Sequence, residues 1–182
     1  MRWGRERLPA PVLAAAELGP GERVLAFAAL TAGWTVATTH ALHVVTTLGE
    51  DGVPDSARRV AWTDVRTATT VPSEQLFDVL LVDGARWSVP VGAKPGRLPE
   101  TIRERVQNSV VHVRLVEVRR GKGVHVVARR TPEEQVSIQV SVDAGVDATD
   151  PEVVAQVERT RSEMTADLRL EARGRPGRPP AG

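Results

Sequence analysis

The sequence predicts an α+β fold made mostly of antiparallel strands, and three observations lead to this expectation. Short runs rich in Val and Thr recur between Glu22 and Val91, with turn-forming residues between them. The hydrophobic period then becomes that of a helix over LPETIRERVQNSVV, where Leu98, Ile102 and Val106 are four residues apart. A second section of alternating residues and a last helical pattern complete the chain.

The first strands come from a run without Asp, Glu, Lys or Arg, which covers residues 24–49. About 20 apolar residues can cross a bilayer, so a membrane helix is the alternative. The run contains six threonines together with His40 and His43, and a histidine pair is costly in lipid. Branching at Cβ suits Thr and Val to strands. We therefore expect three strands here and no membrane span.

Four further strands are expected after a loop over residues 49–57. They are RRVAWTDV, RTATTV, EQLFDVLLVDG and ARWSVPV. The last two are joined by Asp83–Gly84, and Asp-Gly between two such runs is a strong hairpin signal. Pro90 cannot donate to a strand ladder, so its strand should lie at an edge or contain a bulge.

The second section begins with a hairpin whose register has two alternatives. A three-residue GKG loop would place Val118 opposite Val126 and Val116 opposite Ala128, which gathers the apolar side chains on one face. A two-residue loop would place Glu117 opposite Val126. The first register is preferred because it gives an apolar face.

A half-buried strand and a helix follow the hairpin. QVSIQVSV alternates without exception, and Asp150 and Pro151 are suited to the N-cap and first position of a helix. Beyond Glu171 the chain is rich in Arg, Gly and Pro and is expected to be disordered. The predicted core contains Val24, Leu25, Phe27, Trp34, Val36, Leu42, Val44, Val60, Trp62, Leu80, Trp87, Ile102, Val106, Ile138, Val140 and Val157.

Composition restricts the possible classes of function. The 182 residues carry a formal net charge of +1, so the molecule has no strong overall field to attract nucleic acid or anionic lipid. The absence of Cys excludes disulfides, thiolate metal sites and a cysteine nucleophile. Pro9, Pro11 and Glu17 interrupt the apolar N-terminal segment, which argues against a secretory signal. The expected location is the cytoplasm.

Several of the strand sequences resemble a known family. GERVLAFA, GWTVATTHALHVV, RRVAWTDV and ARWSVPV are similar to small bacterial pleckstrin-homology-like proteins, particularly actinobacterial ones, over about residues 20–110. The hairpin, strand and helix at 111–170 resemble the usual C-terminal continuation of those proteins. The resemblance implies a bent β-sandwich with one helix that caps an open end, followed by a three-stranded meander and a C-terminal helix.

The resemblance also implies a binding or assembly module rather than an enzyme. Eukaryotic members bind phosphoinositides through basic residues in the first loop between strands. That loop is Ala29-Leu30-Thr31-Ala32 in this chain and contains no cation. Phosphoinositide binding is therefore not expected. The domain organisation should be a lead-in segment at 1–19, the sandwich with its helix at 20–110, the meander and helix at 111–171, and a disordered tail at 172–182.

A cluster of cations around the predicted hairpin is a candidate docking surface for an acidic protein partner. Like charges that face each other cost stability unless a carboxylate or an anion lies between them. The preferred register places Arg114 opposite Arg130, and neutralisation by Glu117, Glu133 and Glu134 is the preferred explanation, with the docking surface as the alternative. The candidate residues are Arg114, Arg119, Arg120, Lys122, Arg129 and Arg130.

The tail offers a second candidate site. Arg173-Gly174-Arg175-Pro176 resembles the core of an AT-hook, in which two arginines flanking a glycine lie in the narrow minor groove of A·T-rich DNA. It occurs in one copy without lysines around it. GC-rich DNA also encodes Arg, Gly and Pro frequently in tails that have no function. We prefer this codon bias as the explanation of the Arg-Gly-Arg-Pro sequence.

No residue set in the sequence has the pattern of a catalytic or metal site. His40-x-x-His43 straddles a predicted turn and has no evident third ligand, so it is not assigned to a metal. No serine elbow or phosphate loop is present in the sequence. We assign no catalytic residues and no cofactor. The expected function is non-enzymatic protein binding or self-association, with a DNA-associated or a membrane-associated protein as alternatives.

Overall fold

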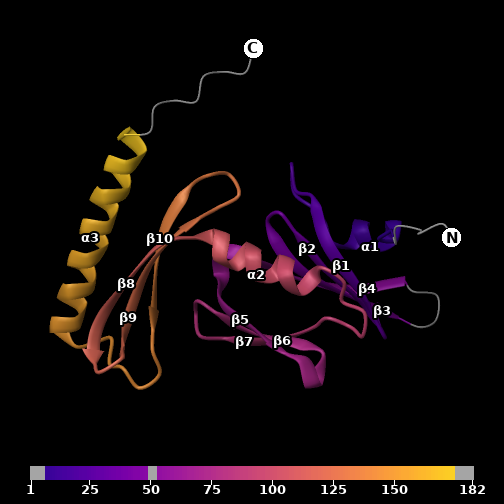
Figure 1. Ribbon diagram of the computed structural model, residues 1–182, viewed down its shortest axis with the longest axis horizontal. Coiled ribbons are helices and arrows are strands. Elements are labelled where there is room, and N and C mark those ends of the chain that lie inside the picture. The colour runs from indigo at the N-terminus through magenta and orange to yellow at the C-terminus, as the bar shows by residue number, and fades with distance from the viewer. Residues whose placement is uncertain (1–6, 49–52, 175–182) are drawn as a thin grey trace, which may run out of the picture. The chain divides into compact units, whose positions relative to one another are not determined.

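The computed structural model describes residues 7–48 and 53–174, and it confirms the predicted α+β class (Figure 1). The paired strands lie in three sheets of four, three and three strands. The chain divides into two compact units. Unit 1 contains the described residues up to Ser109 together with Arg130–Gln135. Unit 2 contains Val110–Arg129 and the described residues from Val136 onward.

The four-stranded sheet of unit 1 has the order β1-β2-β3-β4. Its strands are β1 (Val24–Leu30), β2 (Gly33–Thr38), β3 (Ala41–Leu48) and β4 (Val53–Ala61). The charge-free run therefore forms three antiparallel strands, as expected. Among the described residues, no helix combines the length and apolar character needed to cross a membrane.

The start of β4 corrects one expectation. Residues 49–57 are expected to form a loop, whereas β4 already begins at Val53. Its early part pairs with β3, because Ala57 lies opposite Val45 and Ser56 lies opposite Thr46. The polar composition of this stretch, which suggested a loop, is compatible with a strand whose side chains are exposed on the sheet.

The second sheet of unit 1 has the order β5-β6-β7 and runs through β5 (Val65–Val71), β6 (Leu76–Leu81) and β7 (Arg86–Pro90). One-turn 3-10 helices precede and follow β5: η1 at Trp62–Asp64 and η2 at Pro72–Glu74. The expected Asp-Gly turn joins β6 to β7. Pro90 lies on an edge strand, as predicted, where its missing N–H breaks no central ladder.

Two helices complete unit 1 and cover different apolar surfaces. The helix α2 (Leu98–Ser109) lies where the helical period predicted it, and Leu98 and Ile102 are fully buried in the main core with Phe77. Inside the lead-in segment, α1 (Ala10–Ala15) places Val12 in a second, smaller core. The four-stranded sheet therefore contributes residues to two cores, because successive strand residues point to opposite faces.

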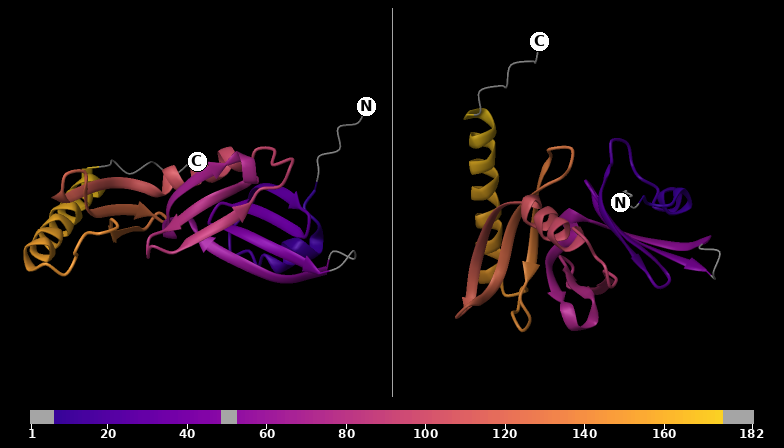
Figure 2. Two further views of the ribbon diagram at one scale, coloured as in Figure 1. Left: turned by 90° about the horizontal axis from the view of Figure 1, so that it is seen from below. Right: turned by 45° about the vertical axis from the view of Figure 1, so that its right-hand side comes forward.

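Unit 2 is a three-stranded sheet with a long helix along one face (Figure 2). Its elements are β8 (Val110–Arg119), β9 (Lys122–Arg130), β10 (Val136–Val142) and α3 (Pro151–Gly174). The strand order is β10-β9-β8. The side chain of Asp150 accepts a hydrogen bond of 2.8 Å from the amide of Glu152, which confirms the predicted N-cap.

The register of the β8–β9 hairpin differs from both predicted alternatives. Val116 lies opposite Val124, and Arg114 lies opposite Val126 rather than opposite Arg130. A two-residue turn ends in Gly121, which has a φ of +72°, and an irregularity in β8 absorbs one residue. Gly123 lies inside the strand, where a Cβ atom would be 2.0 Å from the carbonyl oxygen of Val116. This glycine is needed for close approach of two strands.

The predicted core is mostly confirmed, with three exceptions. Leu25 is 43% exposed, Val140 is 37% exposed, and the half-buried Leu80 belongs to no core cluster of the described residues, whereas Leu81 packs against the main core. A bulge at the start of β1 shifts the alternation, so that Ala26 and Ala28 point inward. Val140 lies on the edge strand β10, whereas α3 packs chiefly over β8. Strand alternation alone does not predict which part of a sheet a helix covers.

Candidate functional site

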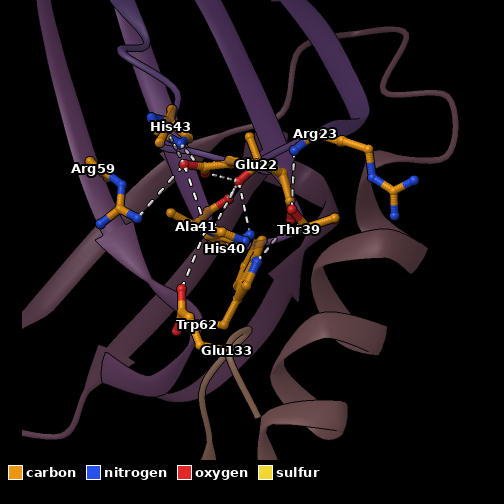
Figure 3. A network of polar contacts seen from close by, with 11 residues as sticks. Glu22, Arg23, Thr39, His40, Ala41, His43, Arg59, Trp62 and Glu133 are labelled. Atoms are coloured by element: carbon orange, nitrogen blue, oxygen red, sulfur yellow. Dashed lines mark hydrogen bonds and ion pairs between the residues drawn. The ribbon is translucent and has the colours of Figure 1, made fainter. Parts of the chain in front are cut away.

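A buried carboxylate, that of Glu22, lies at the beginning of β1 in unit 1 (Figure 3). A tight turn positions it, because the amide of Glu22 donates to the carbonyl oxygen of Gly19 at 3.0 Å. The amide of Gly19 donates back to Oε2 of the same carboxylate at 2.9 Å. The hydroxyl of Thr38 donates to Oε1, and Nε2 of His43 lies 3.2 Å from Oε1. Residues from three segments therefore meet at one carboxylate.

Two further cationic or titratable groups lie at the limit of contact with this carboxylate. Nδ1 of His40 and Nη2 of Arg59 are each 3.9 Å from Oε2 of Glu22. Arg59 is half exposed, whereas the side chains of Glu22 and His43 are fully buried. Arg59 can therefore compensate the buried negative charge from the solvent side of the cluster.

Burial and hydrogen bonding act in opposite directions on the two buried groups. Burial raises the pKa of the Glu22 carboxyl, but the donors from Thr38, Gly19 and His43 lower it and hold it below its ordinary value. Burial lowers the pKa of His43 below its ordinary value, although Glu22 favours the charged imidazole. A neutral His43 then donates its Nε2 proton to an ionised Glu22.

The Glu22–His43 pair fixes structure rather than contacting ligand. Neither side chain is exposed, so no substrate can reach their polar atoms. Nδ1 of His43 has no hydrogen-bond partner among the described residues, which is unusual for a buried nitrogen. The pair ties the start of β1 to the residues on both sides of the β2–β3 turn. These same segments border a pocket that is open to solvent.

The pocket lies within unit 1 and has a volume of about 570 Å³. This volume is in the range of small-ligand sites. The start of β1, the β2–β3 turn, η1, the C-terminal half of α2 and the segment 130–135 form its walls. The lining residues are Gly21, Arg23, Thr39, His40, Trp62, Thr63, Arg105, Asn108, Ser109, Arg130, Thr131, Pro132 and Glu134.

Positive charge predominates in this lining. Arg23, Arg105 and Arg130 contribute three guanidinium groups, and Glu134 contributes one carboxylate, which lies 3.3 Å from Arg130. Nη2 of Arg105 donates to Glu104 at 3.0 Å, but its buried Nε has no hydrogen-bond partner among the described residues. Arg105 was expected on the solvated face of its helix, and it instead lies half-buried in the pocket wall.

The predicted cluster of partner-binding cations occupies several different environments. Arg114 forms ion pairs with Glu163 at 2.9 Å and Asp167 at 2.8 Å on α3. Arg129 is 2% exposed, and Arg130 at the end of β9 lines the pocket. Arg119, Arg120 and Lys122 are exposed around the β8–β9 turn. The amide of Gly121 donates to Glu117 in the same turn at 2.7 Å.

The tail candidate is mostly outside the described residues. Arg173 and Gly174 are the last residues of α3, which therefore extends beyond the predicted helix end at residue 171. Arg175 and Pro176 lie outside the described part of the chain. The AT-hook hypothesis stays a prediction from the sequence.

The histidine pair straddles the turn between β2 and β3, as predicted. Within residues 7–48 and 53–174, no group of three His, Cys, Asp or Glu side chains could hold a metal ion. Sequence reasoning missed Glu22 as the partner of His43, because 21 residues separate them. A usable signal was present, since a histidine inside a buried apolar run requires a polar partner.

Arg23, Arg105 and Arg130 were likewise not recognised as members of one site, because they come from distant parts of the chain. Comparison of the chain with models of protein families, with curated proteins and with solved structures finds no match. The function therefore has to be inferred from the residues of the chain itself.

Proposed function

We propose that this chain is a non-enzymatic binding module for a partner protein and that unit 1 is a pleckstrin-homology-like domain. The observation that carries the proposal is the open pocket in unit 1, in which three arginines meet hydroxyl and amide side chains. Arginine presents several hydrogen-bond donors in a fixed plane and is common at protein interfaces.

The element order supports the fold assignment. Seven antiparallel strands form a four-stranded and a three-stranded sheet, and the helix α2 follows them. Leu98 and Ile102 of this helix are buried in the same core as residues of both sheets, such as Leu42 and Phe77. This is the arrangement expected of a sandwich with one capping helix.

The chemistry of the pocket favours recognition over catalysis. Acid–base catalysis requires a titratable group within hydrogen-bond reach of a substrate. The pair with perturbed pKa values next to the pocket, Glu22 and His43, is fully buried and is used to hold two turns in place. The groups that face the pocket are mainly hydrogen-bond donors and cations, together with His40 and Glu134, and they form no catalytic arrangement with the buried pair.

Affinity capture from the producing cells tests this proposal, with and without nuclease. We expect a stoichiometric protein partner that survives nuclease. The partner should be lost with Arg23→Glu, whose side chain is exposed and therefore not needed for folding. Arg97→Glu, an exposed arginine in unit 1 outside the pocket, is the matched control and should retain the partner.

Two results would overturn the proposal. One is recovery of nucleic acid in place of protein, with its loss when residues 172–182 are deleted. The other is a protein partner whose capture is the same for wild type, Arg23→Glu and Arg97→Glu, because the pocket would then play no part in binding.

A further inference from the structure

We propose that the pocket in unit 1 recognises an acidic peptide segment of its partner, in which two neighbouring side chains carry carboxylates. This inference rests on the proposed function and adds the chemical class of the ligand. Three observations lead to it: the charge of the lining, the exposed donors of two arginines, and the acidic segment that the chain itself places beside the pocket.

The charge of the lining is local. The whole chain has a net charge of +1, yet three arginines and one glutamate line this pocket. A cleft lined mainly by one sign of charge concentrates ligands of the opposite sign. The ligand should therefore be anionic.

Two of the arginines in the lining have hydrogen-bond donors that are available to a ligand. Arg23 forms no ion pair with any described residue, and its side chain is exposed. Arg105 is 27% exposed; its Nη2 donates to Glu104, and because its Nε is buried, only its terminal nitrogens can meet a ligand. A guanidinium with unused donors binds a carboxylate through charge-assisted, often bidentate, hydrogen bonds.

The chain itself places one carboxylate in the lining of this pocket, that of Glu134, and a second one, that of Glu133, beside the lining residue His40. Glu133 lies 4.0 Å from Nδ1 of His40, and Glu134 lies 3.3 Å from Arg130. Their side chains are 61% and 75% exposed, so both contacts are loose and solvent-screened. The segment Pro132-Glu133-Glu134 of the chain therefore resembles the acidic peptide that we propose as the ligand. A partner segment with better contacts would compete with these carboxylates.

One feature disfavours a nucleic acid as the ligand. Trp62 is 4% exposed, so the pocket presents no aromatic surface on which a base could stack.

The test uses the full chain and a fluorescein-labelled peptide, Thr-Pro-Glu-Glu-Gln, which repeats residues 131–135. Binding is followed by fluorescence anisotropy at about 50 mM salt, where screening is weak. We expect saturable binding, with affinity at least about tenfold lower for Thr-Pro-Gln-Gln-Gln, because charge-assisted hydrogen bonds are lost.

Variants locate the binding. Arg23→Gln and Arg105→Gln should each weaken peptide binding about tenfold, and Arg97→Gln should leave it within about twofold. The double variant Glu133→Gln and Glu134→Gln should bind the acidic peptide more tightly than wild type, by about threefold or more, because the internal competitor is removed. Unchanged circular dichroism shows that each variant is folded.

Equal binding of the two peptides, or no effect of Arg23→Gln and Arg105→Gln, would overturn the inference. Tighter binding of pyrophosphate than of the acidic peptide, with the same dependence on both arginines, would also overturn it in favour of a phosphate ligand. If the peptide fails but Arg23→Glu still abolishes capture of the cellular partner, the binding module stands and only its ligand class is wrong. If capture is also unaffected, both proposals fall.

Discussion

The polar contacts of Glu22 in unit 1 and of Arg114 in unit 2 lie in different environments. Unit 1 encloses the Glu22–His43 pair and surrounds it with a core that contains Phe77, Trp62 and Trp87. Unit 2 has a core of valines, one alanine and Met164, and its clearest ion pairs, around Arg114, lie at the surface. The Glu22–His43 pair therefore lies inside unit 1, whereas the Arg114 ion pairs lie at the surface of unit 2, which buries Arg129 as a further polar residue.

This difference predicts how each unit responds to substitution. Removal of the partner of a buried polar group lowers the free energy of unfolding strongly, because a desolvated donor or acceptor is left unpaired. An exposed ion pair is replaced by water at little cost. Loss of the buried Glu22 carboxylate in unit 1 should therefore cost more than loss of the exposed Arg114 ion pairs in unit 2.

Separate spectroscopic probes are available for the two units. All four tryptophans precede Ser109 in the sequence, so tryptophan fluorescence reports on the part of the chain that contains unit 1. The longest helix, α3 with 24 residues, belongs to unit 2 and dominates the helical signal in circular dichroism.

The largest effect is expected for Glu22→Ala. The change leaves the Gly19 amide, the Thr38 hydroxyl and the His43 imidazole without their shared acceptor. We expect a loss of about 3–5 kcal/mol in the free energy of unfolding, measured by urea denaturation with tryptophan fluorescence. Glu74→Ala, at an exposed glutamate in the same unit, should change it by less than about 0.5 kcal/mol. A loss below about 1 kcal/mol for Glu22→Ala would contradict a structural role for this carboxylate.

An apolar change should be the most damaging kind in unit 2. Met164 is fully buried between α3 and the sheet, so Met164→Ala should cost about 2–4 kcal/mol. The measurement is urea denaturation followed by circular dichroism at 222 nm. Val154→Ala on the exposed face of α3 is the control and should cost less than about 1 kcal/mol. Equal effects of the two changes would mean that α3 does not pack as described.

Acid should weaken unit 1 through His43. The pKa of His43 is lowered in the folded chain. Below about pH 6.5 its imidazole is therefore protonated in the unfolded chain while it is still neutral in the folded chain. The contribution of His43 to the free energy of unfolding is fully present above this pH. It falls as pH decreases, by at most about 1.4 kcal/mol per pH unit. Glu22 adds a second loss in more acidic solution, because its folded pKa is also lowered.

Denaturation midpoints at pH 7.5 and 5.5, followed by tryptophan fluorescence, measure this effect. His43→Gln, which keeps an amide donor but does not titrate, should remove most of the slope between these values. His112→Gln, at an exposed histidine on β8, is the control and should leave the slope intact. The same slope in wild type and His43→Gln would exclude His43 as its source.

The smallest effect is expected at the surface of unit 2. Arg114→Gln removes both ion pairs to α3, but these side chains are between 33% and 57% exposed. We expect a loss of less than about 1 kcal/mol, and high salt should reduce it further. A loss comparable to that of Glu22→Ala, measured by circular dichroism, would remove the proposed contrast between the units.

Local patterns predicted the elements of the fold well. The order of the seven strands of unit 1, the place of α2 and the Asp150 N-cap follow from alternation, helical period and turn residues over a few positions, although β4 begins and ends earlier than the expected strand RRVAWTDV. The register of the β8–β9 hairpin was wrong in both alternatives. It depends on an irregularity in β8 and on the close approach at Gly123, and neither has a signature in the alternation of apolar residues.

The candidate site could be predicted only in fragments. His40 and His43 were placed correctly around a turn, and Arg130 was singled out as a member of a different cluster. Glu22, Arg23 and Arg105 were not associated with them, because their partners are remote in sequence. A hydrogen bond between residues 21 positions apart depends on how strands pair and not on local propensity.

The amino-acid sequence alone was enough to determine the α+β class, the strand count of unit 1 and the place of the helix α2. These features depend on interactions between residues only a few positions apart, where periodicity and capping act. Only the tertiary structure showed that a buried carboxylate joins the turns of unit 1 and that three distant arginines line one pocket. Side chains from separate elements meet only when the strands have paired and the helix has packed, so their shared chemistry has no local signature.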